Sequence, residues 1–193
     1  MRNKLIAISL VVASVFCMGC GKSNKIDGLY KTEIGNEEGA DSTIMKMEFD
    51  ADKKTYTQSI ESSGLSGETG KGTFEVDEEK NSITCKGEDG KETVFKIKDD
   101  MIYPVDFVYQ GEVPDSKTFN ATFTYADGSA GVMFKEDGTY IMLQNGEPVQ
   151  SDKMMGTYEK SGDTIKRNTT TGAFVLDWIV VDGGIVNSYY TKE

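Results

Sequence analysis

The chain carries two copies of one short pattern, and this repetition restricts its fold more than any other feature of the sequence. Four motifs of the first copy recur in the same order in the second copy, at offsets of 82 to 85 residues. The matching pairs are 49–56 with 134–140, 72–75 with 156–159, 82–84 with 164–166, and 98–102 with 181–185. Ordered matches at a nearly constant offset indicate a duplicated structural unit.

Each copy consists of short segments in which apolar and polar residues alternate. In residues 45–49 (MKMEF) the odd positions are apolar and the even positions are charged, which is the period of a half-buried β-strand. Residues 136–138 (EDG) and 161–163 (SGD) are hairpin-turn signals between such segments. We therefore expect an all-β antiparallel meander, with up to about seven strands per copy and closure into a barrel.

The motifs themselves resemble those of the small lipocalin-like domains found in bacterial lipoproteins. The resemblance is carried by Gly28-Leu29-Tyr30, by residues 134–140 and 156–158, and by Asp163-Thr164-Ile165. It implies two tandem lipocalin-like β-barrels, at residues 27–104 and 118–193. One merged barrel is the alternative. Residues 105–117 form a linker, which we expect to pack against one copy or between both because it contains apolar side chains.

The N-terminus has the order of a secretory signal. Arg2 and Lys4 precede a hydrophobic run of 12 residues, 5–16, which is too short to span a bilayer. Gly19-Cys20 then resembles the lipobox of bacterial lipoproteins. The resemblance implies that residues 1–19, a signal helix, are removed, that Cys20 carries a diacylglyceryl group, and that residues 20–26 are a tether. We expect a lipid-anchored protein on the extracytoplasmic face of the cell membrane.

The spacing of Cys17 and Cys20 also fits a redox pair or half of a metal site. A redox C-x-x-C is expected near a βαβ pattern, whereas this pair ends a hydrophobic leader. A zinc site needs further ligands, but the chain has no histidine, and Cys85 is the remaining cysteine. The lipid anchor is therefore the preferred interpretation.

The charge of the chain excludes some partners. Its net charge is −11, and loss of Arg2 and Lys4 with the signal leaves 19 basic and 32 acidic residues, a balance of −13. Anionic lipid headgroups and nucleic acids repel such a body. We expect a monomer that reaches the membrane through Cys20 alone, binds no nucleic acid, and needs no cofactor.

No arrangement of residues predicts an enzyme or a metal site. Cys85 shares strand parity with Ile83, so we expect it to be a small core side chain. Residues 66–72 are glycine-rich but lack the pattern of a phosphate-binding loop, and we expect a mobile hairpin loop there. Asp50 and Asp52 begin an imperfect calcium-loop pattern that we interpret as an acidic turn; calcium binding elsewhere on the acidic surface stays open.

The apolar segment 174–181 (FVLDWIVV) contains the single tryptophan. One interpretation is a central strand covered on both faces, packed against the linker or the other copy. The other is the wall of a ligand cavity, with Trp178, Phe174 and Tyr189 as candidate ligand-binding residues. The sequence thus favours a binding module for a small apolar or glycan ligand, and the alternative is a pocketless module that binds another envelope protein.

Overall fold

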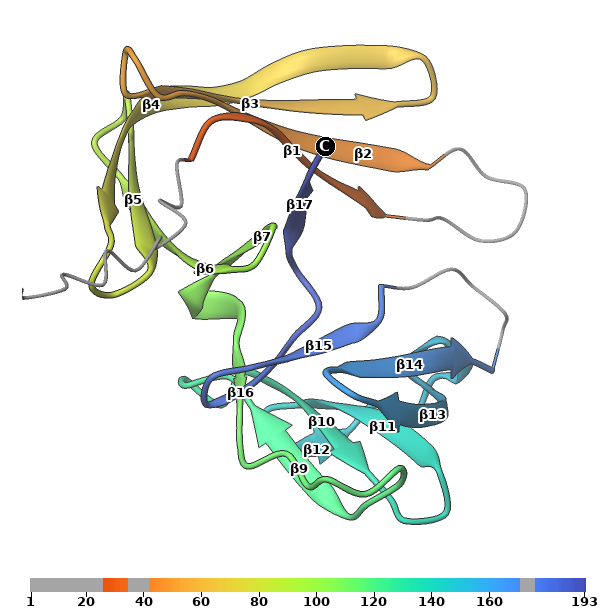
Figure 1. Ribbon diagram of the computed structural model, residues 1–193. Coiled ribbons are helices and arrows are strands. Elements are labelled where there is room, and N and C mark those ends of the chain that lie inside the picture. Colours follow the sequence, from red (N-terminus) through yellow and green to blue (C-terminus); the bar gives the residue numbers. More distant parts are fainter. Residues whose placement is uncertain (1–25, 35–41, 171–175) are drawn as a thin grey trace, which may run out of the picture.

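The chain forms two closed antiparallel β-barrels, each with eight strands. The computed structural model describes residues 26–34, 42–170 and 176–193. Figure 1 shows the barrels one above the other. The all-β prediction with two barrels is confirmed, and the merged barrel is not formed. The predicted signal peptide, residues 20–25 of the predicted tether (with Cys20) and Phe174 lie outside the described residues. Ile26, the last residue of the predicted tether, is buried in the core of the first barrel.

The first barrel combines seven strands of the first repeat with the C-terminal strand of the chain. Its strands are β1 (Gly28–Ile34), β2 (Thr43–Asp50), β3 (Thr55–Ser62), β4 (Leu65–Asp77), β5 (Ser82–Gly87), β6 (Glu92–Lys98), β7 (Met101–Pro104) and β17 (Tyr190–Lys192). Around the barrel they follow the order β1-β17-β7-β6-β5-β4-β3-β2. Apart from β17, neighbours in the barrel are neighbours in the chain, as expected of a meander.

The second barrel is built in the same way. Its strands are β8 (Tyr109–Gln110), β9 (Ala121–Thr124), β10 (Ala130–Phe134), β11 (Thr139–Gln144), β13 (Met155–Ser161), β14 (Thr164–Thr169), β15 (Trp178–Val181) and β16 (Gly184–Val186). Pairing of β10 with β11 closes the barrel, and the short strand β12 (Glu147–Pro148) pairs with β11. Two 3-10 turns, η1 (Val105–Phe107) and η2 (Asp152–Met154), complete the secondary structure of the described residues.

The matching motifs occupy equivalent places in the two barrels. The Phe74 amide donates to the carbonyl of Lys54 (3.0 Å), and the Tyr158 amide donates to the carbonyl of Gly138 (2.8 Å). Both acceptors have positive φ, 54° at Lys54 and 80° at Gly138, a conformation that glycine adopts with least strain. The duplication inferred from the sequence is therefore present in the hydrogen bonding.

Glycine in the repeated Gly-Thr-aromatic motif has a steric cause. A Cβ atom on Gly72 would collide with the backbone carbonyl of Lys86, and one on Gly156 would collide with that of Asn168. In both barrels the following aromatic residue then points into the core, where Phe74 is 4% exposed. Close approach of two backbones thus selects glycine at this position.

The predicted boundaries of the repeats differ from the strand pairing. Strand β8 lies within the predicted linker 105–117 and pairs with β16 in the second barrel. Strand β17 lies within the predicted second repeat but pairs with β1 and β7 in the first barrel. The last strand therefore crosses from one barrel to the other, as Figure 1 shows.

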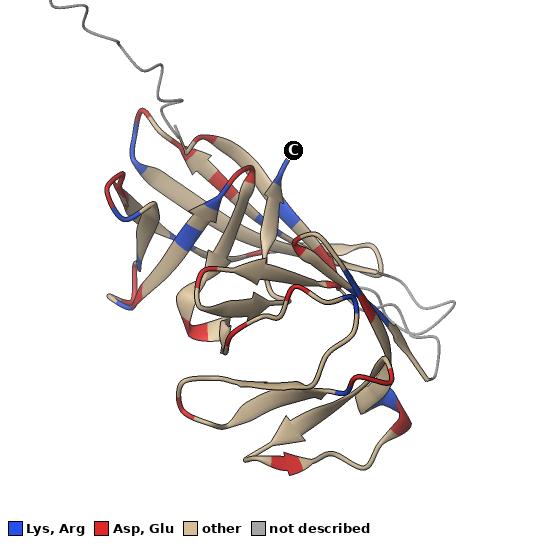
Figure 2. Ribbon diagram, turned by 60° about the horizontal axis from the view of Figure 1, so that its bottom comes forward, with Lys and Arg blue, Asp and Glu red and all other residues tan. Residues whose placement is uncertain are grey.

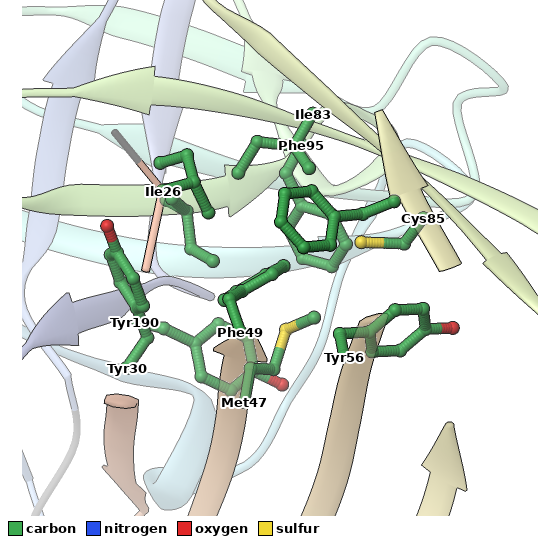
Figure 3. Close-up of a cluster of buried hydrophobic side chains, with 11 residues drawn as sticks. Ile26, Tyr30, Met47, Phe49, Tyr56, Ile83, Cys85, Phe95 and Tyr190 are labelled. Atoms are coloured by element: carbon green, nitrogen blue, oxygen red, sulfur yellow. The ribbon is translucent and has the colours of Figure 1, made fainter. Parts of the chain in front are cut away.

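Aromatic and aliphatic side chains fill the interior of each barrel. The first core contains Met47, Phe49 and Phe95, all at most 3% exposed, and Tyr190 of β17 joins it (Figure 3). Cys85 is 2% exposed in the same cluster, and burial raises the pKa of its thiol to about 12. Its prediction as a core side chain is confirmed.

The glycine-rich segment 66–72 is not a loop. It forms part of strand β4 and pairs with β3, with a register irregularity between Gln58 and Ser59. The glycine residues do not prevent strand formation here, because the hydrogen bonds between β4 and β3 join backbone groups, which glycine also has. The turn that joins β3 to β4 consists of Ser63 and Gly64, both of which have positive φ, and so it precedes the segment in which a loop was predicted.

A third apolar cluster joins the two barrels. Met101 and Tyr103 of β7 pack with Val181 and Val186 of the second barrel. The Lys98 ammonium group adds a polar link, because it donates to Asp163 Oδ2 (2.7 Å) and to the carbonyl of Val180 (2.6 Å). The barrels therefore share a buried contact as well as two chain crossings.

Candidate functional site

Strand β15 is covered on both faces, which explains its nearly continuous apolar sequence. Trp178 and Val180 belong to the core of the second barrel, whereas Ile179 and Val181 belong to the cluster between the barrels. The prediction of a central strand packed against the other copy is confirmed for the described residues of this segment. No helix in that described part is long and apolar enough to cross a membrane.

The structure places Trp178 and Tyr189 near one half-buried cation, Arg167. The Arg167 guanidinium lies 4.1 Å from the centre of the Trp178 ring. The same positive charge opposes the effects of burial and of Asp177, which raise the pKa of Tyr189. Trp178 is 0% exposed, so the residues around it separate its side chain from solvent and from any ligand outside the barrel.

Arg167 is held by the start of β15. Its Nε donates to the carbonyl of Leu176 (2.7 Å), and its backbone amide donates to Asp177 Oδ1 (3.1 Å). Burial lowers the pKa of the guanidinium, and the nearby phenols of Tyr140 and Tyr109 counteract that shift. The Trp178 ring, through a cation–π contact, and the nearby Asp177 carboxylate both stabilise this charge.

Tyr140 connects this cluster to the surface. Its ring lies 5.1 Å from that of Trp178, and the residue is 3% exposed. The Tyr140 hydroxyl and Trp178 Nε1 are buried without a hydrogen bond of good geometry. Burial raises the pKa of Tyr140, and its interaction with the Arg167 guanidinium opposes that rise. Tyr140 also lines a cleft of about 600 Å³ beside strands β11, β13 and β14.

Apolar side chains, uncharged polar side chains and one lysine line this cleft. Ile141 and Met155 line it together with Tyr140. Hydroxyl and amide side chains complete the lining: Thr139, Thr157, Asn168, Thr170 and Gln150. Lys135 also lines the cleft, and none of the described lining residues carries a carboxylate. On a chain with 32 acidic residues, such a surface is distinct from its surroundings.

The first barrel has a cleft at the equivalent place with different chemistry. It measures about 480 Å³ and is lined by Tyr56, the counterpart of Tyr140. Its other lining residues include Glu68, Glu88 and Asp89, with Lys71 and Lys91. The two repeats therefore share the position of the cleft. Acidic residues line the cleft of the first barrel, and none of the described residues that line the cleft of the second barrel is acidic.

Many acidic residues have a structural role in turns, and Figure 2 shows many of them there. Asp50 Oδ1 accepts a hydrogen bond from the Lys53 amide (3.0 Å), and Asp137 Oδ1 accepts one from the Thr139 amide (3.0 Å). Side-chain hydrogen bonds from Lys53 and Thr139, together with these backbone bonds, lower the pKa of the two carboxyl groups. This accounts for Asp50 as part of an acidic turn.

Metal-binding geometry is absent from the described part of the chain. Residues 26–34, 42–170 and 176–193 contain no group of three or more His, Cys, Asp or Glu side chains able to hold a metal ion. The raised pKa of Cys85 keeps its thiol protonated near neutral pH, so it is a poor nucleophile.

The sequence pointed to Trp178 but missed the residues around it. Tyr140 follows the turn motif Asp137-Gly138-Thr139 and Asn168 faces Thr157 across β13 and β14, so both positions depend on strand pairing. Arg167 has no sequence signal that separates it from a surface cation. The half-buried position of this arginine beside Trp178 becomes evident only in the folded barrel.

Comparison with known proteins gives limited information. No family model matches the chain, and no curated protein matches it. Among solved structures, the chain is similar to the crystal structure of the Cpx pathway activator NlpE from Escherichia coli, with 13% sequence identity and a TM-score of 0.34. That match covers 77% of this chain and 95% of the other chain. The function of this chain is therefore inferred from its own residues.

Proposed function

We propose that this chain is a lipid-anchored, non-enzymatic binding protein of the extracytoplasmic cell envelope, and that its ligand is a small neutral glycan. The observation that carries the proposal is the cleft of about 600 Å³ beside Tyr140. Small-molecule sites typically have volumes of about 300–1,000 Å³, so the cleft has room for a few sugar rings.

The lining favours a glycan over a charged ligand. Sugars present hydroxyl groups at their edges and C–H groups on their faces, so they need neutral hydrogen-bonding groups beside an apolar platform. Thr157 and Asn168 supply the first, while Ile141 and Met155 supply the second. None of the described lining residues carries a carboxylate, so on a chain of net charge −11 the cleft is a less acidic surface than its surroundings.

The anchor is supported by the order of residues 2–20. Two acyl chains on Cys20 hold a protein stably at a membrane, whereas one chain binds only marginally. Metabolic labelling with radioactive palmitate tests this part: the wild-type chain is expected to take up label, and the Cys20→Ala variant is not. Equal labelling of both chains, or of neither, contradicts the anchor.

Binding is tested on the soluble chain from residue 20 with Cys20→Ser. Tri-N-acetylglucosamine is a suitable neutral probe, and isothermal titration calorimetry measures its affinity. We expect saturable binding that weakens at least about tenfold in Thr157→Lys, because each lost contact of about 1.4 kcal/mol changes affinity by that factor. The loss arises because the long charged side chain enters the cleft.

The repeat supplies a matched control. Thr73 follows Gly72 as Thr157 follows Gly156, is likewise exposed, and does not line the cleft of the first barrel. Thr73→Lys is therefore expected to leave binding unchanged. Absence of binding in the wild type, or an equal loss in both variants, overturns the glycan site.

A second function is favoured by the filled interiors of both barrels. Phe123 and Ile83 are 0% exposed in the two cores, and the candidate cavity residue Trp178 is also 0% exposed and therefore inaccessible. This favours the alternative of an envelope protein that binds another protein through its outer strand faces. Chemical crosslinking in the native envelope, followed by mass spectrometry, separates the two: a partner trapped by wild-type and Thr157→Lys chains alike supports protein binding.

A further inference from the structure

The two repeats have exchanged their eighth strands. Strand β8 follows β7 in the chain but completes the second barrel, and β17 follows β16 but completes the first barrel. Each barrel therefore contains seven strands of one repeat and a last strand from the other. Such an exchange is the arrangement of a strand-swapped dimer within a single chain.

The register of the two exchanged strands is the same. Tyr190 of β17 pairs with Ile102, and Tyr109 of β8 pairs with Ile185. Ile102 and Ile185 occupy matching positions of the repeated motif 98–102 and 181–185. Tyr109 and Tyr190 are 4% and 7% exposed, so each anchors its strand in the core of the barrel that receives it.

The bonds that flank the two strands also match. The Lys192 amide donates to the carbonyl of Asp100 (2.8 Å), and the Gly111 amide donates to the carbonyl of Gly183 (3.1 Å). These donors follow Tyr190 and Tyr109 by two residues, and the acceptors precede Ile102 and Ile185 by two residues. The same slot, between the first and seventh strands of a repeat, is therefore present twice and filled the same way.

We propose that the slot between β1 and β7 is a strand-acceptor site, and that its partner is the C-terminal strand of a second copy of this chain. The second copy supplies the same Tyr190 anchor and the same backbone bonds, so the exchanged ladder is identical to the one within the chain. Reciprocal exchange of β17 then joins two chains in a closed dimer.

Strand β17 is suited to leave its slot. It is three residues long and forms two paired positions with each neighbour. Beyond Tyr190, its residues are exposed. A short strand with few paired positions and one buried side chain opens locally at low cost. The link to β16, residues 187–189, is short, and short links between swapped elements favour exchange between chains.

Cysteine crosslinking between two differently labelled chains tests the proposal. Lys31 of β1 and Thr191 of β17 are register partners on the outer face, and directly opposed residues lie within disulfide reach. In a Cys20→Ser background, ¹⁵N-labelled Lys31→Cys chain is mixed with unlabelled Thr191→Cys chain under mild oxidation. Neither chain can form this bridge alone, so a mixed disulfide reports a β17 from one copy beside the β1 of the other.

The control replaces Lys31→Cys by Glu159→Cys, whose side chain is exposed on the second barrel. We expect the Lys31–Thr191 mixed disulfide to exceed this control and to increase with protein concentration. A yield equal to that of the control at every concentration overturns the proposal, because random collision then explains both.

Link length provides a second measurement on the same chain. Deletion of Asn187 and Ser188 leaves Tyr189 as the whole link, which disfavours return of β17 to its own barrel. We expect the molar mass from light scattering to shift from one chain to two. The double variant Asn187→Gly, Ser188→Gly keeps the length and is expected to stay at one chain. A folded deletion variant with the mass of one chain refutes exchange between copies.

Discussion

The hydroxyl group of Tyr158 contacts the backbone of two segments in the second barrel. It accepts a hydrogen bond from the Phe119 amide (2.6 Å), and lies 2.7 Å and 3.0 Å from the carbonyl oxygens of Phe119 and Lys135. Tyr158→Phe removes this atom and keeps the ring. The Phe119 amide, in a residue that is 4% exposed, then loses its partner.

The expected cost follows from that loss. A buried donor left without a partner costs about 1–3 kcal/mol, so we expect Tyr158→Phe to lower the free energy of unfolding by about 2 kcal/mol. In a chain of this length that corresponds to a fall in the melting temperature of about 4–8 °C. Phe74, at the matching position of the first barrel, shows that the fold accepts a phenylalanine ring there when the neighbouring backbone is satisfied otherwise.

Tyr140→Phe is the matched control in the same barrel. The Tyr140 hydroxyl is buried without a hydrogen bond of good geometry; its polar neighbour is the Arg167 guanidinium, which also donates to the carbonyl of Leu176, so its removal leaves no backbone amide without a partner. We expect the stability to stay unchanged or to rise, because an unpaired buried hydroxyl is itself unfavourable.

Urea unfolding followed by tryptophan fluorescence measures both variants. Trp178 is the single tryptophan and lies in the core of the second barrel, so its emission reports on this barrel. If Tyr158→Phe is as stable as Tyr140→Phe, the hydroxyl contacts do not contribute as described, and the assignment of this corner as a stabilising element is wrong.

Three further predictions follow from single contacts. In thermal unfolding, Gly156→Ala is expected to destabilise the chain by about 1–3 kcal/mol, because the new Cβ atom collides with a neighbouring backbone carbonyl. Gly67 has open space around it, so Gly67→Ala is expected to be neutral or stabilising in the same assay. The pKa of Cys85 is raised to about 12, so its thiol is expected to resist iodoacetamide at pH 8 in the native state and to react in urea; rapid reaction of the native chain would contradict its burial. The stability that the protonated thiol contributes is fully present below the pKa of the unfolded chain and is lost as the pH rises toward 12. Lys98→Met removes the ion pair with Asp163 between the barrels and is expected to lower the free energy of unfolding in urea by about 1 kcal/mol or less, because Asp163 is largely exposed. A fall of several kcal/mol would contradict this and would mean that the ion pair is the main contact between the barrels.

Local patterns in the sequence predict much of the fold. The alternation in residues 45–49 identifies β2, and Met47 and Phe49 are buried as that alternation requires. The signals around Gly138 and Gly162 mark turns whose positive φ favours glycine. These features depend on a few adjacent residues, so they can be inferred without the rest of the chain.

The candidate site was predicted less completely for a physical reason. Trp178 stood out by composition, but its surroundings come from β11 and β14, which are distant in sequence. The burial of Arg167 depends on closure of the barrel. The lack of acidic lining in the cleft beside Tyr140 depends on which side chains strand pairing brings together.

By itself, the sequence determined that the chain is a duplicated β-structure with tight turns, because each of these properties arises from neighbouring residues. Only the tertiary structure decided that the last strand of each repeat closes the other barrel. Segments of two or three residues, such as Tyr109–Gln110 and Tyr190–Lys192, have too few positions for a pattern. Their places are set by backbone bonds to strands far away in the chain, and only the folded molecule brings those strands together.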